Sequence, residues 1–193
     1  LGIGDRTIIV LLSDHGEEFG EHGGLGHGRT LYREVLHVPL LVWAPGLVAP
    51  ARITTPLSLL DVAPTLLDIL GIRADKGHDG VSLSALLRTS SAARPARARP
   101  IFGEIDRDDL IAHDHVRAVS VRAGGRTAIA NLIDGTTRCY GADDPAEMHS
   151  EAQPQNDCRP LAPFLTARRE ALSRLSVVRA TAAAAAVDPR TID

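Results

Sequence analysis

A short apolar run that ends in two polar residues is the feature that most constrains this chain. Residues 7–13 are almost all apolar and several are β-branched. Such a run is typical of a strand buried on both faces of a mostly parallel sheet. Asp14 and His15 follow it at once. Open α/β sheets place their ligand sites at the carboxyl ends of central strands, so the sequence predicts a functional site here.

The segments after this strand predict a loop, a second strand and two helices. Residues 17–28 are rich in glycine and poor in apolar side chains, which indicates an exposed loop. Residues 38–44 have the composition of another buried strand. Residues 61–71 show helical spacing, with Asp61 as the N-cap, and residues 81–87 predict a further helical turn. We therefore expect an α/β structure in which helices flank the sheet.

The character of the sequence changes after residues 90–100, a stretch of Ala, Arg and Pro that we interpret as a solvated loop. Short strand-like runs at residues 118–121 and 127–132 flank Gly124-Gly125, which is a hairpin signal. A helix is expected at about residues 163–186. The second part of the chain is thus predicted to be a small antiparallel subdomain with a terminal helix.

The composition excludes several classes of protein. Hydrophobic residues make up 44% and charged residues 23%, as in ordinary globular proteins. A net charge of -3 gives no reason to expect a nucleic-acid partner. No apolar run approaches the ~18 residues of a membrane span. Cys139 and Cys158 form neither a disulfide framework nor a metal-ligand spacing, and we expect Cys158 to be a free or buried structural thiol.

Asp14 and His15 are the first candidate site. A carboxylate oxygen and an imidazole nitrogen are both ligands for divalent cations, and side by side at the end of a strand they can converge on one ion. The alternative is structural, with Asp14 capping the following turn and His15 hydrogen-bonding at the sheet edge. These two residues alone leave both interpretations open.

Five motifs follow one another along the chain: Ser13-Asp-His-Gly-Glu-Glu-Phe-Gly-Glu-His-Gly23, Gly26-His-Gly-Arg-Thr-Leu-Tyr-Arg-Glu34, His37-Val-Pro-Leu40, Ser58-Leu-Leu-Asp-Val-Ala-Pro-Thr-Leu-Leu-Asp-Ile-Leu-Gly71 and Asp134-Gly-Thr-Thr-Arg-Cys-Tyr-Gly-Ala-Asp-Asp-Pro-Ala-Glu147. In this order they closely resemble the sulfatase family of the alkaline phosphatase superfamily. The resemblance spans about residues 3–175. It implies a partial alkaline-phosphatase-like sheet, mostly parallel and flanked by helices, followed by the small antiparallel subdomain.

The resemblance also implies roles for particular residues. In sulfatases the residues matching Asp14 and His15 complete a metal site begun by carboxylates near the N-terminus, and Ca²⁺ is the expected ion. The residue matching His27 contacts the sulfate oxygens or donates a proton to the leaving group, and Arg29 competes for this role. His22 is a further candidate for substrate binding. The structural alternative for His27 is a solvated loop histidine.

Two parts of a sulfatase site are missing from this sequence. Family members attack with a residue made from Cys in Cys-x-Pro/Ala-x-Arg. The segment Cys158-Arg-Pro-Leu-Ala162 ends in Ala and follows the Asp-His motif, so we reject it as the nucleophile. No paired aspartates precede Asp14. We therefore expect a fragment that is inactive alone. Its expected parts are residues 1–99, the C-terminal part of the catalytic α/β domain, and residues 100–193, the antiparallel subdomain with its helix.

The leading functional interpretation is metal-dependent hydrolysis of a small-molecule or saccharide sulfate ester. A second is hydrolysis of a phosphodiester or phosphonate ester, or phosphoryl-group transfer, with Mn²⁺ or Zn²⁺ as the ion. A third is a non-catalytic binding module. The sequence leaves the substrate, the compartment and the oligomeric state open.

Overall fold

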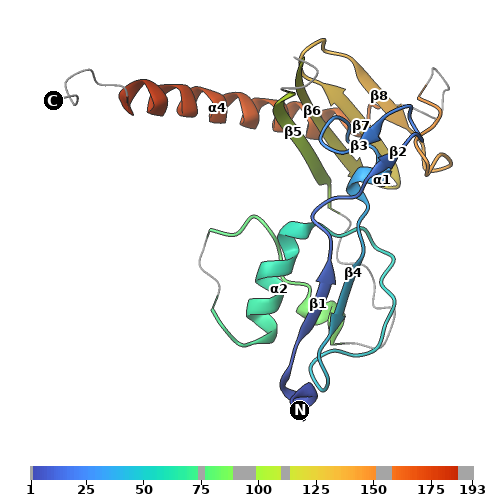
Figure 1. Ribbon diagram of the computed structural model, residues 1–193, viewed down its shortest axis with the longest axis vertical. Coiled ribbons are helices and arrows are strands. Elements are labelled where there is room, and N and C mark those ends of the chain that lie inside the picture. Colours follow the sequence, from blue (N-terminus) through green and yellow to red (C-terminus); the bar gives the residue numbers. More distant parts are fainter. Residues whose placement is uncertain (1, 74–76, 89–98, 110–113, 151–157, 187–193) are drawn as a thin grey trace.

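The structure is a computed structural model that describes residues 2–73, 77–88, 99–109, 114–150 and 158–186. These residues form two bodies (Figure 1). One is built around β1, β4 and α2, and the other around the sheet of β5 to β8. The predicted loop at residues 90–100 lies almost wholly outside the described residues. The division of the chain at residues 99 and 100 therefore stays a prediction.

The first body contains a two-stranded sheet and short helices. Its strands, β1 (Ile9–Leu12) and β4 (Leu40–Trp43), confirm the two predicted strands. Its helices are η1 (Gly4–Arg6), η2 (Leu59–Asp61), α2 (Val62–Ile69) and α3 (Ser84–Leu87). Asp61 is fully buried at the predicted N-cap position. Its carboxylate accepts hydrogen bonds from the backbone N–H groups of Ser58 and Val81, which ties η2 to the segment before α3.

The pairing of these strands differs from the expected parallel arrangement. β1 and β4 are antiparallel, and Leu12 lies opposite Leu40. Parallel neighbours need a crossover that returns the chain to the opposite end of the sheet. Here the chain re-enters the sheet beside the end that it left. Every strand pair within the described residues is antiparallel.

The burial of these strands also differs from expectation, because they were predicted to be covered on both faces. One face of the pair is 47–59% exposed, and it consists of Ile9, Leu11, Leu41 and Trp43. The α/β class itself is confirmed.

The second body is the predicted antiparallel subdomain. Its sheet has the order β5-β6-β7-β8, with bounds Ile101–Asp109, Asp114–Ala123, Arg126–Asn131 and Thr137–Tyr140. Gly124 and Gly125 form the predicted hairpin turn, and both have positive φ. Helix α4 (Ala162–Ala186) follows, as expected. Its first turns pack on β6 and β7 in a core of Val119, Val121, Ala128, Ala130, Leu161 and Leu165.

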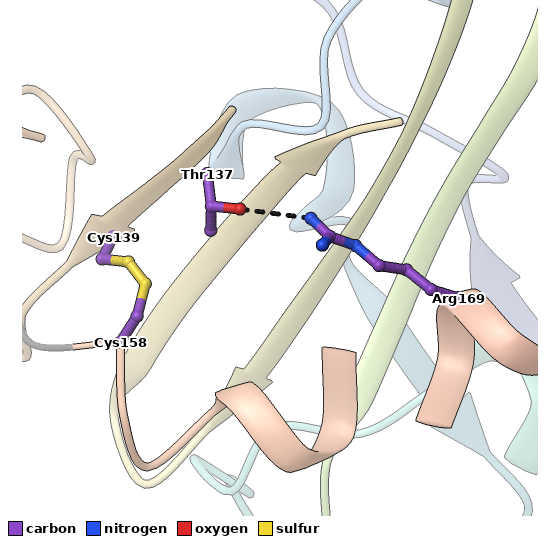
Figure 2. The surroundings of a disulfide bond; sticks show 4 residues. All are labelled: Thr137, Cys139, Cys158 and Arg169. Atoms are coloured by element: carbon purple, nitrogen blue, oxygen red, sulfur yellow. Dashed lines mark hydrogen bonds between the residues drawn. A yellow bond between two sulfur atoms is a disulfide. The ribbon is translucent and has the colours of Figure 1, made fainter. Parts of the chain in front are cut away.

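A disulfide joins β8 to the turn before α4 (Figure 2). Cys139 and Cys158 are its partners, with their Cα atoms 5.6 Å apart. The expectation of a free or structural thiol at Cys158 was therefore wrong. Sequence spacing could not reveal the pair, because the hairpin and the turn bring together residues that are 19 positions apart. Arg169 donates to Thr137 beside the disulfide, which adds a second link between α4 and β8.

The predicted loop after β1 packs against the second body. It contains the short strands β2 (Glu18–Phe19) and β3 (Leu25–Gly26) and leads into α1 (Arg33–Leu36). In Figure 1 these elements lie beside β7 and β8. Arg138 of β8 donates to the Tyr32 hydroxyl over 2.6 Å, and Leu36 packs on Gly103 of β5. No described helix is both long enough and apolar enough to cross a membrane.

Candidate metal and anion site

Asp14 and His15 converge directly after β1, and the geometry leaves both able to bind a cation. His15 Nδ1 lies 2.8 Å from the Gly16 carbonyl oxygen, which can only accept. The proton of a neutral ring therefore sits on Nδ1 and leaves the Nε2 lone pair available. His15 Nε2 lies 3.7 Å from Asp14 Oδ2, and the two side chains are 40% and 87% exposed. The pair thus presents one nitrogen and one carboxylate on the same side of the chain.

Asp14 is held in its ionised form by the backbone. The backbone N–H of His15 donates to Asp14 Oδ1 over 3.0 Å. This hydrogen bond, followed by that of Asp14's own N–H, lowers the pKa of the Asp14 carboxyl below its ordinary value of 3.8. A metal ligand must be deprotonated, and the lowered pKa of Asp14 meets this requirement.

His27 joins the pair from the other end of the loop. Its ring stacks on His15, with centroids 3.9 Å apart and planes at 29°. His27 Nδ1 lies 3.2 Å from both carboxylate oxygens of Glu17. This contact follows from the pairing of β2 and β3. Gly26 lies opposite Glu18, so the neighbouring residues His27 and Glu17 come close together. The structure therefore brings Asp14, His15 and His27 together.

The other two predicted residues lie in different surroundings. Arg29 is exposed on the segment between β3 and α1. His22 has a side chain only 9% exposed, and its ring stacks on Tyr32 with centroids 3.6 Å apart. Its Nδ1 lies 2.6 Å from Glu34 Oε1 and its Nε2 lies 2.9 Å from the Glu147 carbonyl oxygen. Because both nitrogens have partners, the structure favours a structural role for His22 over substrate contact.

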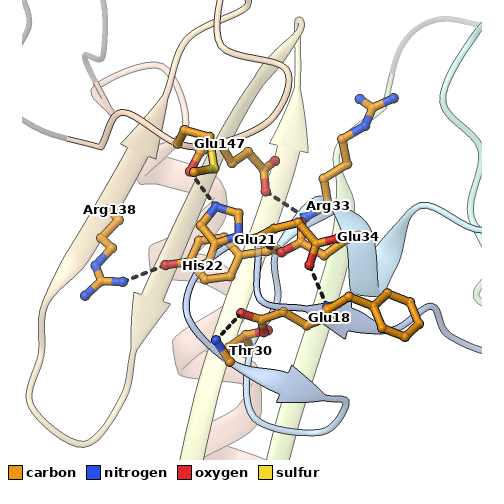
Figure 3. A network of polar contacts seen from close by, with 12 residues as sticks. Glu18, Glu21, His22, Thr30, Arg33, Glu34, Arg138 and Glu147 are labelled. Atoms are coloured by element: carbon orange, nitrogen blue, oxygen red, sulfur yellow. Dashed lines mark hydrogen bonds and ion pairs between the residues drawn. The ribbon is translucent and has the colours of Figure 1, made fainter.

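A second group of possible metal ligands surrounds His22 (Figure 3). Glu18, His22 and Glu34 each offer one ligand atom, and these atoms lie within 4.8 Å of one another. Glu18 is 3% exposed, and its carboxylate accepts hydrogen bonds from the Gly24 N–H and the Thr30 hydroxyl. An ion would have to displace these hydrogen bonds and those of His22. The cluster is therefore satisfied as a buried polar network.

Two residues near the site were not identified from the sequence. Arg107 of β5 lies over Gly28, and an added Cβ at Gly28 would come within 2.1 Å of its guanidinium. Glu147 is 2% exposed and contacts both His22 and α1. Glu147 ends the Asp-Pro-x-Glu motif, which was the available signal, whereas nothing in the local sequence marks Arg107.

A cleft of about 1810 Å³ opens between the two bodies, and Asp14 lies on its wall. Arg33, His37 and Arg122 line the same cleft. Burial lowers the pKa of His37 below its ordinary value, and the charges of Arg33 and Arg122 lower it further. Arg122 is paired with Glu147, so Arg33 supplies positive charge to this part of the cleft wall, which suits an anionic ligand.

The sequence comparisons point to one family. Residues 1–72 match the family model described as Sulfatase. Arylsulfatase K of Mus musculus is 40% identical over 91 residues, which are 47% of this chain and 16% of that protein. A sulfatase of Formosa agariphila is 30% identical over 148 residues, which are 76% of this chain and 26% of that protein. The chain thus spans a minor part of the length of these relatives.

Solved structures share the fold. A putative sulfatase from Bacteroides thetaiotaomicron has a TM-score of 0.69 at 23% identity, covering 98% of this chain and 41% of that one. A protein in complex with its substrate D-glucosamine-2-N,6-O-disulfate has a TM-score of 0.66 at 24% identity, with 98% and 37% covered. A phosphonate monoester hydrolase from Silicibacter pomeroyi has a TM-score of 0.64 at 24% identity, with 88% and 35% covered.

Proposed function

This chain belongs to the sulfatase family of the alkaline phosphatase superfamily, and on that premise we propose that it carries part of a metal-dependent site for the hydrolysis of sulfate esters. Asp14 and His15 are the proposed metal ligands, and His27 is the proposed contact to the sulfate group. The observation that carries the proposal is the convergence of these three side chains at the end of β1.

The donor set fits a divalent cation. Asp14 offers an ionised oxygen and His15 a nitrogen whose proton is fixed on the other side of the ring. Carboxylate oxygen and imidazole nitrogen are accepted by Ca²⁺, Mn²⁺ and Zn²⁺ to different degrees, and we propose Ca²⁺ from the family resemblance. A bound cation would supply Lewis acidity, which stabilises negative charge on a non-bridging oxygen of the ester.

The remaining residues of the site bind and orient the ester. Glu17 pairs with His27 Nδ1, which fixes the orientation of the ring and leaves its Nε2 for contact with the sulfate group. The guanidinium of Arg107, over Gly28, is a second positive group for the same anion. Hydrogen-bond donors and charges held in place before reaction are the main source of transition-state stabilisation in such sites.

The substrate class follows from the anionic ester and the cleft. A saccharide sulfate ester is the proposed substrate, supported by the positive charge of Arg33 on the cleft wall and by the sulfated glucosamine bound to a protein of the same fold. Cys158 is held in the disulfide, and no nucleophile is proposed for this chain. We propose that the chain alone binds metal and anion but does not hydrolyse the ester.

Metal binding is the direct test, since it requires no turnover. Isothermal titration with Ca²⁺ should show binding to the chain and a loss of at least about tenfold in affinity for D14N. E170Q is the matched control, because Glu170 is an exposed carboxylate on α4. Equal affinities of D14N and E170Q would contradict the metal site. Binding of sulfated saccharide that survives in both variants would favour a non-catalytic module.

Phosphonate or phosphate ester chemistry is the second candidate, and the fold shared with a phosphonate monoester hydrolase favours it. The two candidates differ in the anion and in the ion. Titration of the Ca²⁺-loaded and Mn²⁺-loaded chain with inorganic sulfate and phosphate separates them. Tighter binding of sulfate with Ca²⁺ is expected, and tighter binding of phosphate with Mn²⁺ would support the second candidate.

A further inference from the structure

Glu147 combines an unusual backbone with a buried carboxylate, although it makes no contact with Asp14 or His15. Its φ is 60°, and among the described residues it is the one non-glycine with a positive φ. It is 2% exposed. L-residues with larger side chains rarely adopt this conformation, and they keep it only where the surrounding contacts impose it. The contacts of Glu147 therefore indicate the role of this residue.

These contacts join three elements that are far apart in the sequence (Figure 3). Glu147 Oε2 accepts from the backbone N–H of Arg33 over 2.8 Å, at the start of α1. Its Oε1 pairs with Arg122 of β6. Its carbonyl oxygen accepts from Nε2 of His22, in the loop between β2 and β3, over 2.9 Å. Glu147, a residue of the second body, thus contacts both α1 and the loop between β2 and β3.

Helix α1 in turn fixes the residue after His15. The Gly16 N–H donates to the Val35 carbonyl over 2.7 Å. The approach is so close that a Cβ on Gly16 would lie 2.0 Å from the Glu34 carbonyl oxygen. Gly16 also accepts from His15 Nδ1, which sets the orientation of that ring. The path from Glu147 to His15 therefore runs through α1 and Gly16, with a hydrogen bond at each step.

We propose that Glu147 is a positioning residue for the Asp14–His15 site, acting through α1. The expected effect of Glu147 on metal affinity rests on the proposed function. The link itself depends only on the hydrogen bonds of Glu147, α1 and Gly16. Supporting groups that never touch the ion set the geometry of its ligands and affect its affinity strongly.

The test uses the full chain with three substitutions at one position. E147A removes the carboxylate, E147Q keeps an oxygen for the Arg33 N–H, and E147G removes the carboxylate while tolerating the positive φ. Amide exchange of Gly16, followed by NMR, reports the α1 link, and calorimetry with Ca²⁺ reports the site. E147A and E147G should speed Gly16 exchange and weaken Ca²⁺ binding at least about tenfold. E147Q should restore part of both, and E170Q should match the wild type.

The outcomes separate this inference from the proposed function. Unchanged Gly16 exchange in folded E147G would overturn the positioning role. If E147A loses its native circular dichroism spectrum, E147G and E147Q still test the positioning role. E147G relieves the backbone strain at the positive φ, and E147Q keeps an oxygen for the Arg33 N–H. A wild-type chain that binds no Ca²⁺ would refute the metal site, while faster Gly16 exchange in E147G would still establish the link to α1.

Discussion

At the scale of single residues, His22 is a side chain whose charge the fold controls. Burial alone would lower its pKa, but the hydrogen bond to the Glu147 carbonyl and the hydrogen bond and charge of Glu34 outweigh burial, and the charge of Glu18 adds to them. The pKa of His22 is therefore raised above its ordinary value of 6.5. A pKa that is higher in the folded state stabilises the fold. This contribution is complete at pH values below the unfolded-state pKa and is lost as the pH rises through the folded-state pKa.

H22Q tests this pH dependence. The free energy of unfolding of the wild type should exceed that of H22Q by about 1–3 kcal/mol near pH 6, as expected for a buried charged hydrogen bond. The difference should shrink as the pH rises above the folded pKa of His22. Urea denaturation at a series of pH values measures it. A difference that grows with pH would show that His22 is buried as a neutral ring.

Gly16 is a second position where a single residue determines the geometry of the site. Its Cβ-free backbone lets α1 approach, and the obstructing atom for any larger residue is the Glu34 carbonyl, which cannot move without α1. G16A should lower the free energy of unfolding by about 2 kcal/mol or more. G77A is the matched control, since an added Cβ at Gly77 meets no atom within 4 Å. Equal stability of the two variants would place α1 farther from Gly16 than described.

At the scale of elements, the disulfide fixes α4 to β8. Cys139 and Cys158 close a loop of 19 residues, and a loop of this size contributes about 3 kcal/mol through the entropy of the unfolded chain. The double variant C139S/C158S should unfold at correspondingly lower urea concentration. Reductant should destabilise the wild type by a similar amount and leave the double variant unchanged. A wild type insensitive to reductant would show that the disulfide does not form.

The elements themselves were largely predictable, and their contacts were not. Apolar runs identified β1 and β4, helical spacing identified α2, and helix propensity identified α4, because each of these patterns is local. Asp14 and His15 could be selected as site candidates from the sequence, since they follow one strand closely. The antiparallel pairing, the disulfide and the roles of Arg107 and Glu147 depend on residues brought together by the tertiary fold. Glu147 lies 125 positions from His22, and no local pattern carries that information.

At the scale of the whole molecule, the exposed face of β1 and β4 governs behaviour in solution. Leu11 and Leu41 are partners on this face, as are Ile9 and Trp43, and all four side chains are about half exposed. Contiguous apolar surface of this kind promotes association, and the outer edges of this strand pair, with which no other described strand pairs, add to the tendency. Trp43 is the single tryptophan of the chain, so its fluorescence reports directly on this face.

We expect the chain to associate through this face as its concentration rises. Trp43 emission should shift to shorter wavelength over the same range in which sedimentation shows larger species. L11K should weaken association at least about tenfold, because burying one leucine contributes about 1.5–3 kcal/mol. L175K is the matched control, since Leu175 is a comparably exposed leucine on α4. If L175K weakened association and L11K did not, the contact would lie on α4, and the strand face would remain in water at every concentration.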